Sequence, residues 1–359
     1  MNCLKSYIDE QIRTIVYEDG VVATPGNTMG MGNPMAPTDT TPGSEPIVVG
    51  PRKKRKISKN KICTKIKESL LDDDDKFYGA NSDKKIIESW IKDNYRIYGK
   101  LTISDDLVVD CNGDVCVENR SVESLTNGLF RWAKVNGDFY CSSCKKLKSL
   151  EGAPEKVGGS FDCSYCDKLT SLEGCPKDVQ GTFDCSNCGN LKSLEGAPRI
   201  VGECFYCDNC NKLTTLKGAP KKVGDSFYCG GCDNLASLEG APKKVELDFE
   251  CGECENLISL KGTPEEVGGS FSCDCCNKLT SLEDAPKKVD LDFSCIACKN
   301  LTSLKGAPEY VGVNFNCNNC ENLTSLKGGP KKVGGQFWCS DCPNLKITDS
   351  DRKKYIIRY

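Results

Sequence analysis

A unit of 22 residues repeats ten times between residues 136 and 347, and no copy gains or loses a residue. Every copy carries a phenylalanine, a cysteine two residues later and a second cysteine three residues after that. Two leucines follow in the first nine copies, and the tenth keeps only the first of them, Leu345. The phenylalanines are Phe139, Phe161, Phe183, Phe205, Phe227, Phe249, Phe271, Phe293, Phe315 and Phe337. A period this strict requires that each unit forms one coil that stacks on the next, because a single short coil cannot bury its apolar side alone. The repeat therefore predicts a solenoid.

The spacing within the unit indicates which side chains form the core. Phe161 and Cys163 lie two residues apart, so both point to the same face of a short strand. Leu169 and Leu172 are one helical or 3₁₀ turn apart, and Val179 completes the inward-facing set. Each large apolar side chain contributes about 1.5–3 kcal/mol when it is buried, and stacked coils share these buried faces. We expect an α/β-poor repeat solenoid with one short parallel strand in each coil.

The spacing V-x-x-x-F-x-C-x-x-C-x-x-L-x-x-L resembles the leucine-rich repeat in a shortened form. The segments LTSLEGCP at 169–176, LKSLEGAP at 191–198 and LTSLKGAP at 301–308 are more specifically similar to the leucine-rich repeat proteins of tailed bacteriophages. This resemblance runs from about Ile86 to Leu345, and it implies a right-handed stack of ten coils. It also implies that the second cysteine of each pair replaces an asparagine that hydrogen-bonds the neighbouring coil. Asn119 occupies that position before the first copy.

A cap is expected at each end of the stack, since an open end exposes apolar side chains and strand edges. A helical stripe is formed by Ile86, Ile87, Trp90 and Ile91, and Ser82 is the expected N-cap. Asn112-Gly113 lies between alternating apolar runs and predicts a type I′ hairpin turn. The expected organisation is a helix and β-hairpin cap at 81–135, the ten-coil solenoid at 136–347, and a C-terminal cap at 348–359.

Residues 1–80 have the composition of a largely disordered tail, because glycine, proline, threonine and methionine dominate their centre. Short helices are expected at 1–19 and at 60–71. The basic run at 52–61 is the one segment whose charge suits nucleic acid or a targeting role, and a solvated linker is the alternative. The opening sequence lacks the apolar core of a secretory signal, and no apolar run approaches the ~20 residues of a membrane span. We expect neither secretion nor a membrane contact.

Twenty of the 27 cysteines belong to the ten repeat pairs. The pairs are Cys141/Cys144, Cys163/Cys166, Cys185/Cys188, Cys207/Cys210, Cys229/Cys232, Cys251/Cys254, Cys273/Cys276, Cys295/Cys298, Cys317/Cys320 and Cys339/Cys342. Three interpretations are open: zinc held by two pairs, disulfides between stacked cysteines, and structural columns of buried free thiols. The missing secretory signal favours free thiols, and zinc would favour a 44-residue alternation that the cysteines do not show. Histidine is absent, which excludes Ser-His-Asp and Cys-His catalysis, and we expect no enzyme, no metal and no cofactor.

The residue between Phe and the first cysteine points away from the core and forms a candidate partner-binding face. Its aromatic and acidic members are Tyr140, Asp162, Asp184, Tyr206, Tyr228, Glu250 and Trp338, and the other coils carry Ser272, Ser294 and Asn316. This column holds no Lys or Arg, which favours a protein or saccharide partner over nucleic acid. The alternative is that exposed strand positions favour Tyr and Trp in any case. Asp138, Asp248 and Asp292 stand one residue before Phe, next to this column.

The resemblance implies a non-enzymatic phage protein whose solenoid presents an interaction surface to a protein partner. Association with the virion or its assembly is expected, with the N-terminal 80 residues as a tether. The alternative is an effector that stays outside the particle and binds a host protein. Both alternatives place the chain in the host cytoplasm during infection.

Overall fold

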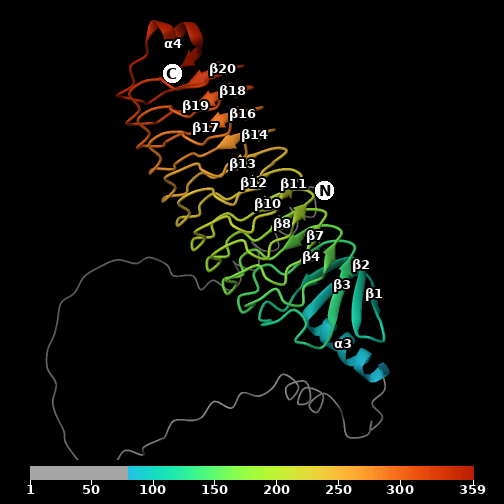
Figure 1. The fold of residues 1–359 in the computed structure, drawn as a ribbon. Helices are drawn as coiled ribbons and strands as arrows, with labels where there is room; N and C mark the ends of the chain where they lie inside the picture. The colour runs from blue at the N-terminus through green and yellow to red at the C-terminus, as the bar shows by residue number, and fades with distance from the viewer. Residues whose placement is uncertain (1–79) are drawn as a thin grey trace, which may run out of the picture. The chain divides into compact units, whose positions relative to one another are not determined.

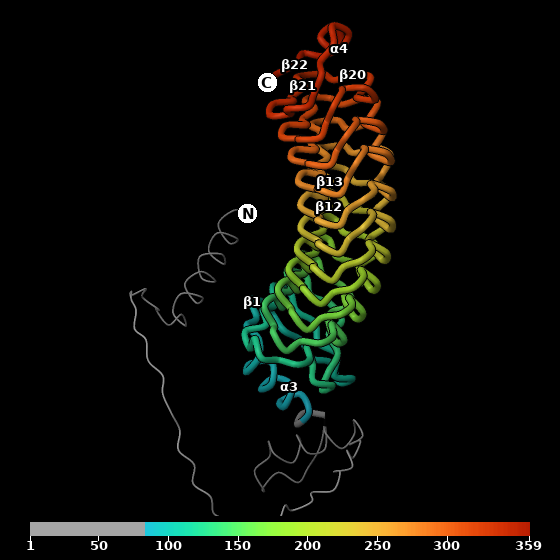
Figure 2. The backbone as a smooth tube through the Cα atoms, turned by 90° about the vertical axis from the view of Figure 1, so that its left-hand side faces the viewer, coloured from blue at the N-terminus to red at the C-terminus, as the bar shows by residue number. Residues whose placement is uncertain are grey.

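The structure, a computed structural model, describes residues 80–359. The tail expected at 1–80, with its short helices at 1–19 and 60–71 and its basic run at 52–61, lies outside the described residues except for Ala80. Residues 80–359 form a parallel β-solenoid of stacked coils, and their two helices lie at the two ends of the stack (Figures 1 and 2). The expected leucine-rich-repeat-like solenoid is confirmed.

Each of the ten coils contributes one short strand that begins at or next to its phenylalanine. These strands are β4 (Phe139–Tyr140), β6 (Phe161–Asp162), β8 (Phe183–Asp184), β10 (Phe205–Tyr206), β12 (Phe227–Tyr228), β13 (Phe249–Glu250), β15 (Phe271–Ser272), β17 (Phe293–Ser294), β19 (Phe315–Asn316) and β21 (Gln336–Trp338). Within the ten coils, each strand pairs in parallel with the strands of the neighbouring coils, and phenylalanine lies opposite phenylalanine. Equivalent positions of neighbouring repeats therefore lie opposite each other in the sheet.

A second row of short strands accompanies the first, where the sequence predicted only one strand in each coil. It consists of β5 (Lys156–Val157), β7 (Asp178–Val179), β9 (Ile200–Val201), β11 (Lys222–Val223), β14 (Glu266–Val267), β16 (Lys288–Val289), β18 (Tyr310–Val311) and β20 (Lys332–Val333). In the remaining coil Val245 bridges Val223 and Val267. The inward-facing valine explains the row, because a β-branched residue favours extended backbone and each valine pairs with the next one along the stack.

The core is a set of columns that run through the whole stack. The Phe, Cys, Leu and Val side chains identified from the spacing are almost all buried. From Phe139 to Phe337 the phenylalanine rings stack on one another, with centroids 4.8–5.5 Å apart and interplanar angles of 5–29°. Aromatic rings in this arrangement gain contact energy beyond their burial, so each coil is held mainly by its two neighbours.

The N-terminal end is closed by a helix and a hairpin, as expected. They are α3 (Ala80–Asn94), β1 (Tyr95–Ile103) and β2 (Val108–Val117), followed by β3 (Arg131–Val135). The predicted turn at Asn112-Gly113 is wrong, because the chain reverses between Ser104 and Leu107 and Gly113 lies inside β2 opposite Gly99. A Cβ on Gly113 would lie 2.0 Å from the carbonyl oxygen of Tyr98, so the glycine serves the close approach of two strands.

The C-terminal end is closed by α4 (Asp349–Lys354) and by β22 (Ile356–Arg358), which pairs in parallel with β21. Thr348 and Asp351 form a capping box at the start of α4. Tyr355 then places its ring on Phe337, with centroids 4.6 Å apart, and its hydroxyl donates to the carbonyl of Pro330 at 2.7 Å. A tyrosine thus ends the phenylalanine column at this cap.

A ladder of short polar side chains runs one residue before the phenylalanine column. Asp138 Oδ1 accepts the backbone N–H of Ser160 at 2.6 Å, and Asp248 Oδ1 accepts that of Ser270 at 2.7 Å. The same bond is made by Ser160, Ser226, Ser270, Asp292 and Asn314 to the coil that follows each of them. These aspartates therefore satisfy backbone donors between coils, which was not anticipated for residues beside the candidate binding face.

Replacing Asp248 by alanine is expected to lower the free energy of unfolding by about 1–3 kcal/mol, because the N–H of Ser270 loses its charged acceptor. Replacing it by serine should cost less than half as much, since Ser226 makes the same bond one coil earlier. Urea unfolding of the two variants beside the parent chain checks this. Equal losses in both variants would show that the charge, and not the hydrogen bond, matters.

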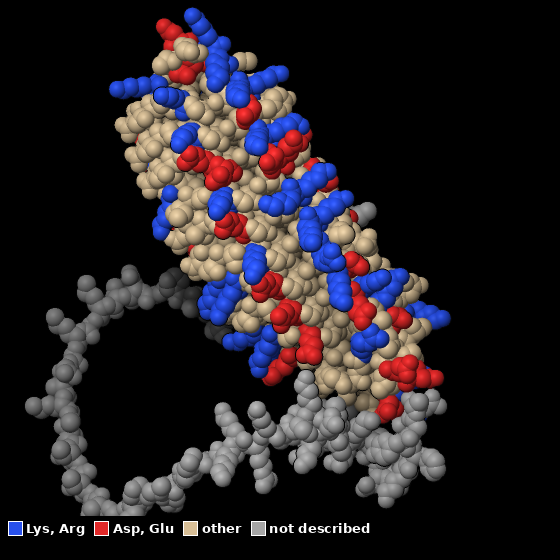
Figure 3. All heavy atoms as spheres, in the orientation of Figure 1, with Lys and Arg blue, Asp and Glu red and all other residues tan. Residues whose placement is uncertain are grey.

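Charged side chains pair between neighbouring coils at the residue after the second leucine. Glu195 pairs with Lys217 at 3.1 Å, and the same contact joins Glu239 to Lys261 and Glu283 to Lys305, each at 2.6 Å. Glutamate and lysine thus alternate from coil to coil between Glu195 and Lys305, whereas the coils before this stretch carry glutamate and the coil after it carries Lys327. On the face that Figure 3 shows, side chains of both signs are interspersed along the stack and form no patch of one sign.

Candidate binding face and cysteine ladder

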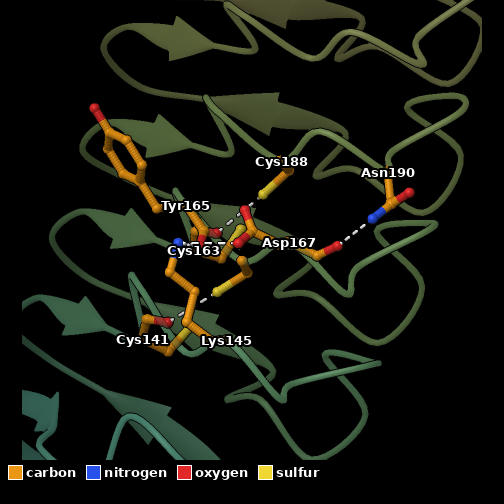
Figure 4. A network of polar contacts seen from close by, with 8 residues as sticks. Cys141, Lys145, Cys163, Tyr165, Asp167, Cys188 and Asn190 are labelled. Carbon is orange, nitrogen blue, oxygen red and sulfur yellow. Dashed lines mark hydrogen bonds and ion pairs between the residues drawn. The ribbon is translucent and has the colours of Figure 1, made fainter. Parts of the chain in front are cut away.

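From the second coil on, the second cysteine of each pair forms the ladder implied by the resemblance. Its thiol donates to the carbonyl oxygen of the first cysteine in the preceding coil, as Cys166 does to Cys141 and Cys188 to Cys163, both at 3.3 Å (Figure 4). The bond recurs at 3.2–3.4 Å for Cys210, Cys232, Cys254, Cys276, Cys298, Cys320 and Cys342. In the cap, Asn119 instead bonds the side chain of Asn94 at 2.8 Å.

A left-handed turn between the two cysteines of a pair places the second thiol under the preceding coil. The residue before the second cysteine has φ between 54° and 61° in all ten coils. Only Gly231 is a glycine there, and Tyr165, Glu253 and Ala297 are among the residues that take this conformation despite their Cβ. The ladder bond recurs in neighbouring coils and holds the turn in the left-handed conformation. Residues other than glycine and asparagine are therefore tolerated there despite the strain.

All cysteines in residues 80–359 are free thiols, and no group of three or more His, Cys, Asp or Glu side chains in that range is arranged to hold a metal ion. Burial raises the pKa of Cys163, Cys185 and Cys229 well above the usual range of a thiol. A protonated thiol is a hydrogen-bond donor and a poor nucleophile. The hydrogen bonds between coils fit the interpretation of structural thiol columns.

The seven candidate face residues lie in one row on the outer side of the strands, in the order of the coils. Six of them are half-buried and Glu250 is exposed. Three support the local structure: Asp162 and Asp184 each accept a backbone N–H two residues on, at 2.8 Å, and Tyr140 donates to Asp138 at 2.6 Å. Tyr206, Tyr228, Glu250 and Trp338 present aromatic rings and a carboxylate in this row and are the members best placed to meet a partner.

Tyr206 and Tyr228 form a stacked pair in the middle of this row. Their ring centroids are 4.6 Å apart and their planes differ by 5°. The next position along the row is Glu250, so among the described residues no third ring continues the stack. An aromatic pair of this kind offers a rigid surface whose ordering on binding costs little entropy.

An open depression of about 280 Å³ lies beside Tyr228. Its lining consists of Asp208, Asn209, Tyr228, Gly230, Gly231, Glu250, Gly252 and Glu253. Of these residues, the sequence analysis named only Tyr228 and Glu250. The missed signal is the position after the first cysteine, which carries a side chain in eight coils but is glycine at 230 and 252.

The depression carries negative charge and no Lys or Arg side chain lines it. Burial raises the pKa of Asp208 to about 7, and the charges of Glu250 and Asp184 act in the same direction. The N–H of Gly230, which donates to Asp208 Oδ1 at 3.0 Å, opposes this shift. Burial also raises the pKa of Glu250, with Asp274 adding to the effect. A positively charged group at this place would relieve the repulsion among the carboxylates.

Within residues 80–359, no helix has the length and apolar character needed to cross a membrane. Searches against protein-family models, curated proteins and solved structures found no match to this chain.

Proposed function

We propose that this chain is a non-catalytic bacteriophage protein whose solenoid presents a binding surface to a protein partner, in association with the virion or its assembly. The row of outward-facing side chains from Tyr140 to Trp338, held at one residue per coil, is the observation that supports binding. The phage assignment rests on the resemblance of the 22-residue unit between about Ile86 and Leu345.

The chemistry of the chain supports a role without catalysis. It has no histidine, and most of its cysteines are free thiols buried in the core. The outer row has aromatic and acidic side chains, which suits a protein surface. Any contact with nucleic acid would run through the basic run at 52–61. The proposed location is the host cytoplasm during infection and then the particle.

Quantitative peptide mass spectrometry on purified virions of the encoding phage tests the association. Solenoid peptides from residues 136–347 are expected at a stoichiometry comparable to that of known particle components. If the protein is abundant in infected cells but missing from particles, the virion role is wrong and an effector bound to a host protein takes its place.

Hydroxyl-radical footprinting tests the binding face itself. Oxidation of Tyr206, Tyr228 and Trp338 is expected to fall at least threefold in the partner-bound state relative to the isolated chain. Tyr310, which lies in the other strand row on β18, is the matched control and should keep its reactivity. Equal reactivity of all four residues in both states would exclude this face as the contact.

A further inference from the structure

Two consecutive glycines interrupt an otherwise filled column beside the binding face. The position after the first cysteine is Ser, Asp, Asn or Ile in eight coils, and Gly230 and Gly252 are the exceptions. Neither has the positive φ that would require glycine. A Cβ on Gly230 would meet its nearest neighbour, the Gly252 carbonyl oxygen, at 3.1 Å, which is tight but leaves room for a small shift. The missing side chains therefore keep the depression open and are not demanded by the backbone.

The wall of this depression is aromatic on one side and acidic on the others. Tyr228 lines it, whereas Tyr206, on the far side of the stacked pair, does not. The stacked pair thus borders the open space through Tyr228. Asp208, Glu250 and Glu253 supply negative charge, and no cation among the lining residues compensates it.

The ligand chemistry that fits is a planar cation on a slender stem. A guanidinium stacks on an aromatic ring and donates paired hydrogen bonds to carboxylates, whereas an ammonium is a compact point charge that gains less from the ring. A volume of about 280 Å³ holds one side chain and not a larger element. The position of the depression, in the middle of the row of outer side chains, suits an anchor at the centre of an interface.

We propose that the depression beside Tyr228 receives an arginine side chain of the protein partner, with the guanidinium against the Tyr228 ring and paired to the carboxylates of Asp208 and Glu250. This inference rests on the proposed binding function and adds the chemistry of the partner. Arginine is the anchor, and the flanking half-buried side chains of the row exclude water around it.

The first test uses the full chain with ¹³C-labelled tyrosine and a blocked Gly-Arg-Gly peptide as the probe, followed by NMR. The Tyr228 ring signals are expected to shift with millimolar affinity, and Gly-Lys-Gly should bind at least threefold more weakly. Asp208→Asn and Glu250→Gln should each weaken binding at least fivefold, and Gly230→Ser should abolish it. Glu173→Gln removes an equal charge from an exposed position outside the face and should change nothing.

The pH dependence gives a second readout. Because Asp208 has a pKa of about 7, its carboxylate ionises as the pH rises from 6 to 8, and the affinity for the arginine peptide should rise up to about tenfold. Asp208→Asn should remove this rise while the chain stays folded by circular dichroism. A peptide affinity that is flat with pH in the parent chain would show that Asp208 does not pair with the probe.

Four outcomes overturn the inference. If the Tyr228 signals do not shift with the arginine peptide, the depression is not a binding site for it. If binding survives in the double variant Asp208→Asn/Glu250→Gln, the proposed ion pair is wrong. Binding of maltohexaose or chitohexaose that depends on Tyr228 but not on the two carboxylates would make it a saccharide site. If the footprint of the bound partner persists unchanged in the double variant, the face still binds a protein and only the arginine anchor is wrong.

Discussion

Raising the pH above about 9 is expected to unfold the solenoid in a transition far steeper than that of an ordinary domain. Seven first cysteines, namely Cys141, Cys163, Cys185, Cys207, Cys229, Cys251 and Cys317, have a pKa raised well above the usual range, with burial as the largest cause. In the unfolded chain these thiols ionise near pH 8.5. Above that pH only the unfolded state releases their protons, so the free energy of unfolding falls as the pH rises.

The size of the effect follows from the number of thiols. Below about pH 8 both states keep these protons, and the stabilisation from the neutral thiols is complete and constant. Above the unfolded-state pKa each thiol that stays protonated in the fold lowers the free energy of unfolding by about 1.4 kcal/mol per pH unit. Seven such thiols together give a slope of about 10 kcal/mol per pH unit. A change of one pH unit is therefore comparable to the whole free energy of unfolding of an ordinary domain.

Circular dichroism during an alkaline titration, with a reductant present, measures this transition. Cys229→Ala and Cys251→Ala in one chain should make the titration shallower by about two protons, although the variant is less stable at pH 7. Glu173→Gln is the control and should leave the slope unchanged. A parent chain that stays folded beyond pH 11, or a slope below two protons, would contradict the argument.

Replacing Phe249 by alanine is expected to lower the free energy of unfolding by about 3–5 kcal/mol. The ring is fully buried and stacks between Phe227 at 5.3 Å and Phe271 at 5.5 Å, so its loss leaves a cavity that two rigid neighbours border. Because coils contact only their neighbours, the damage should divide the stack at this point.

Urea unfolding combined with hydrogen exchange measures both effects. Exchange should accelerate first in the coils of Phe227, Phe249 and Phe271 and last near the two caps. Glu250→Ala changes the next residue of the same strand on its outer side and should alter the stability by less than about 0.5 kcal/mol. A uniform rise of exchange across all ten coils would show that the solenoid unfolds as a single unit and does not divide.

The core was predictable because its signal is repeated ten times. Phenylalanine, cysteine, leucine and valine recur at positions that a strand and a turn must bury, and the structure buries them there. The second strand row was missed because two residues around a valine are too short to show a period. The hairpin turn was misplaced because Asn112-Gly113 has the composition of a tight turn, while the close approach of Gly99 and Gly113 across the strands cannot be read from one strand.

The candidate face was predictable only in outline. Alternation along a two-residue strand places Tyr206, Tyr228 and Glu250 outside, and the structure does so. The depression depends on Gly230 and Gly252, which lack the side chain that the other eight coils carry at this position. The role of Asp248 between coils could not be predicted from the sequence. An aspartate beside an exposed column gives the same sequence pattern whether its carboxylate faces solvent or accepts a backbone N–H.

The alternating column of Glu and Lys from Glu195 to Lys305 disfavours misaligned stacking of these coils while the chain folds. Because neighbouring coils are nearly identical in sequence, the stack can form in the wrong register. One 22-residue unit then loops out, and the coils on either side of it pack against each other. Losing the unit that carries Glu239 would remove its pair with Lys261 and bring Lys217 next to Lys261, which replaces an attraction by a repulsion. Each exposed pair is worth at most about 1 kcal/mol, enough to bias a choice between registers by up to about fivefold. Slippage by two units escapes this penalty, so duplications and deletions in this column should be tolerated best in pairs.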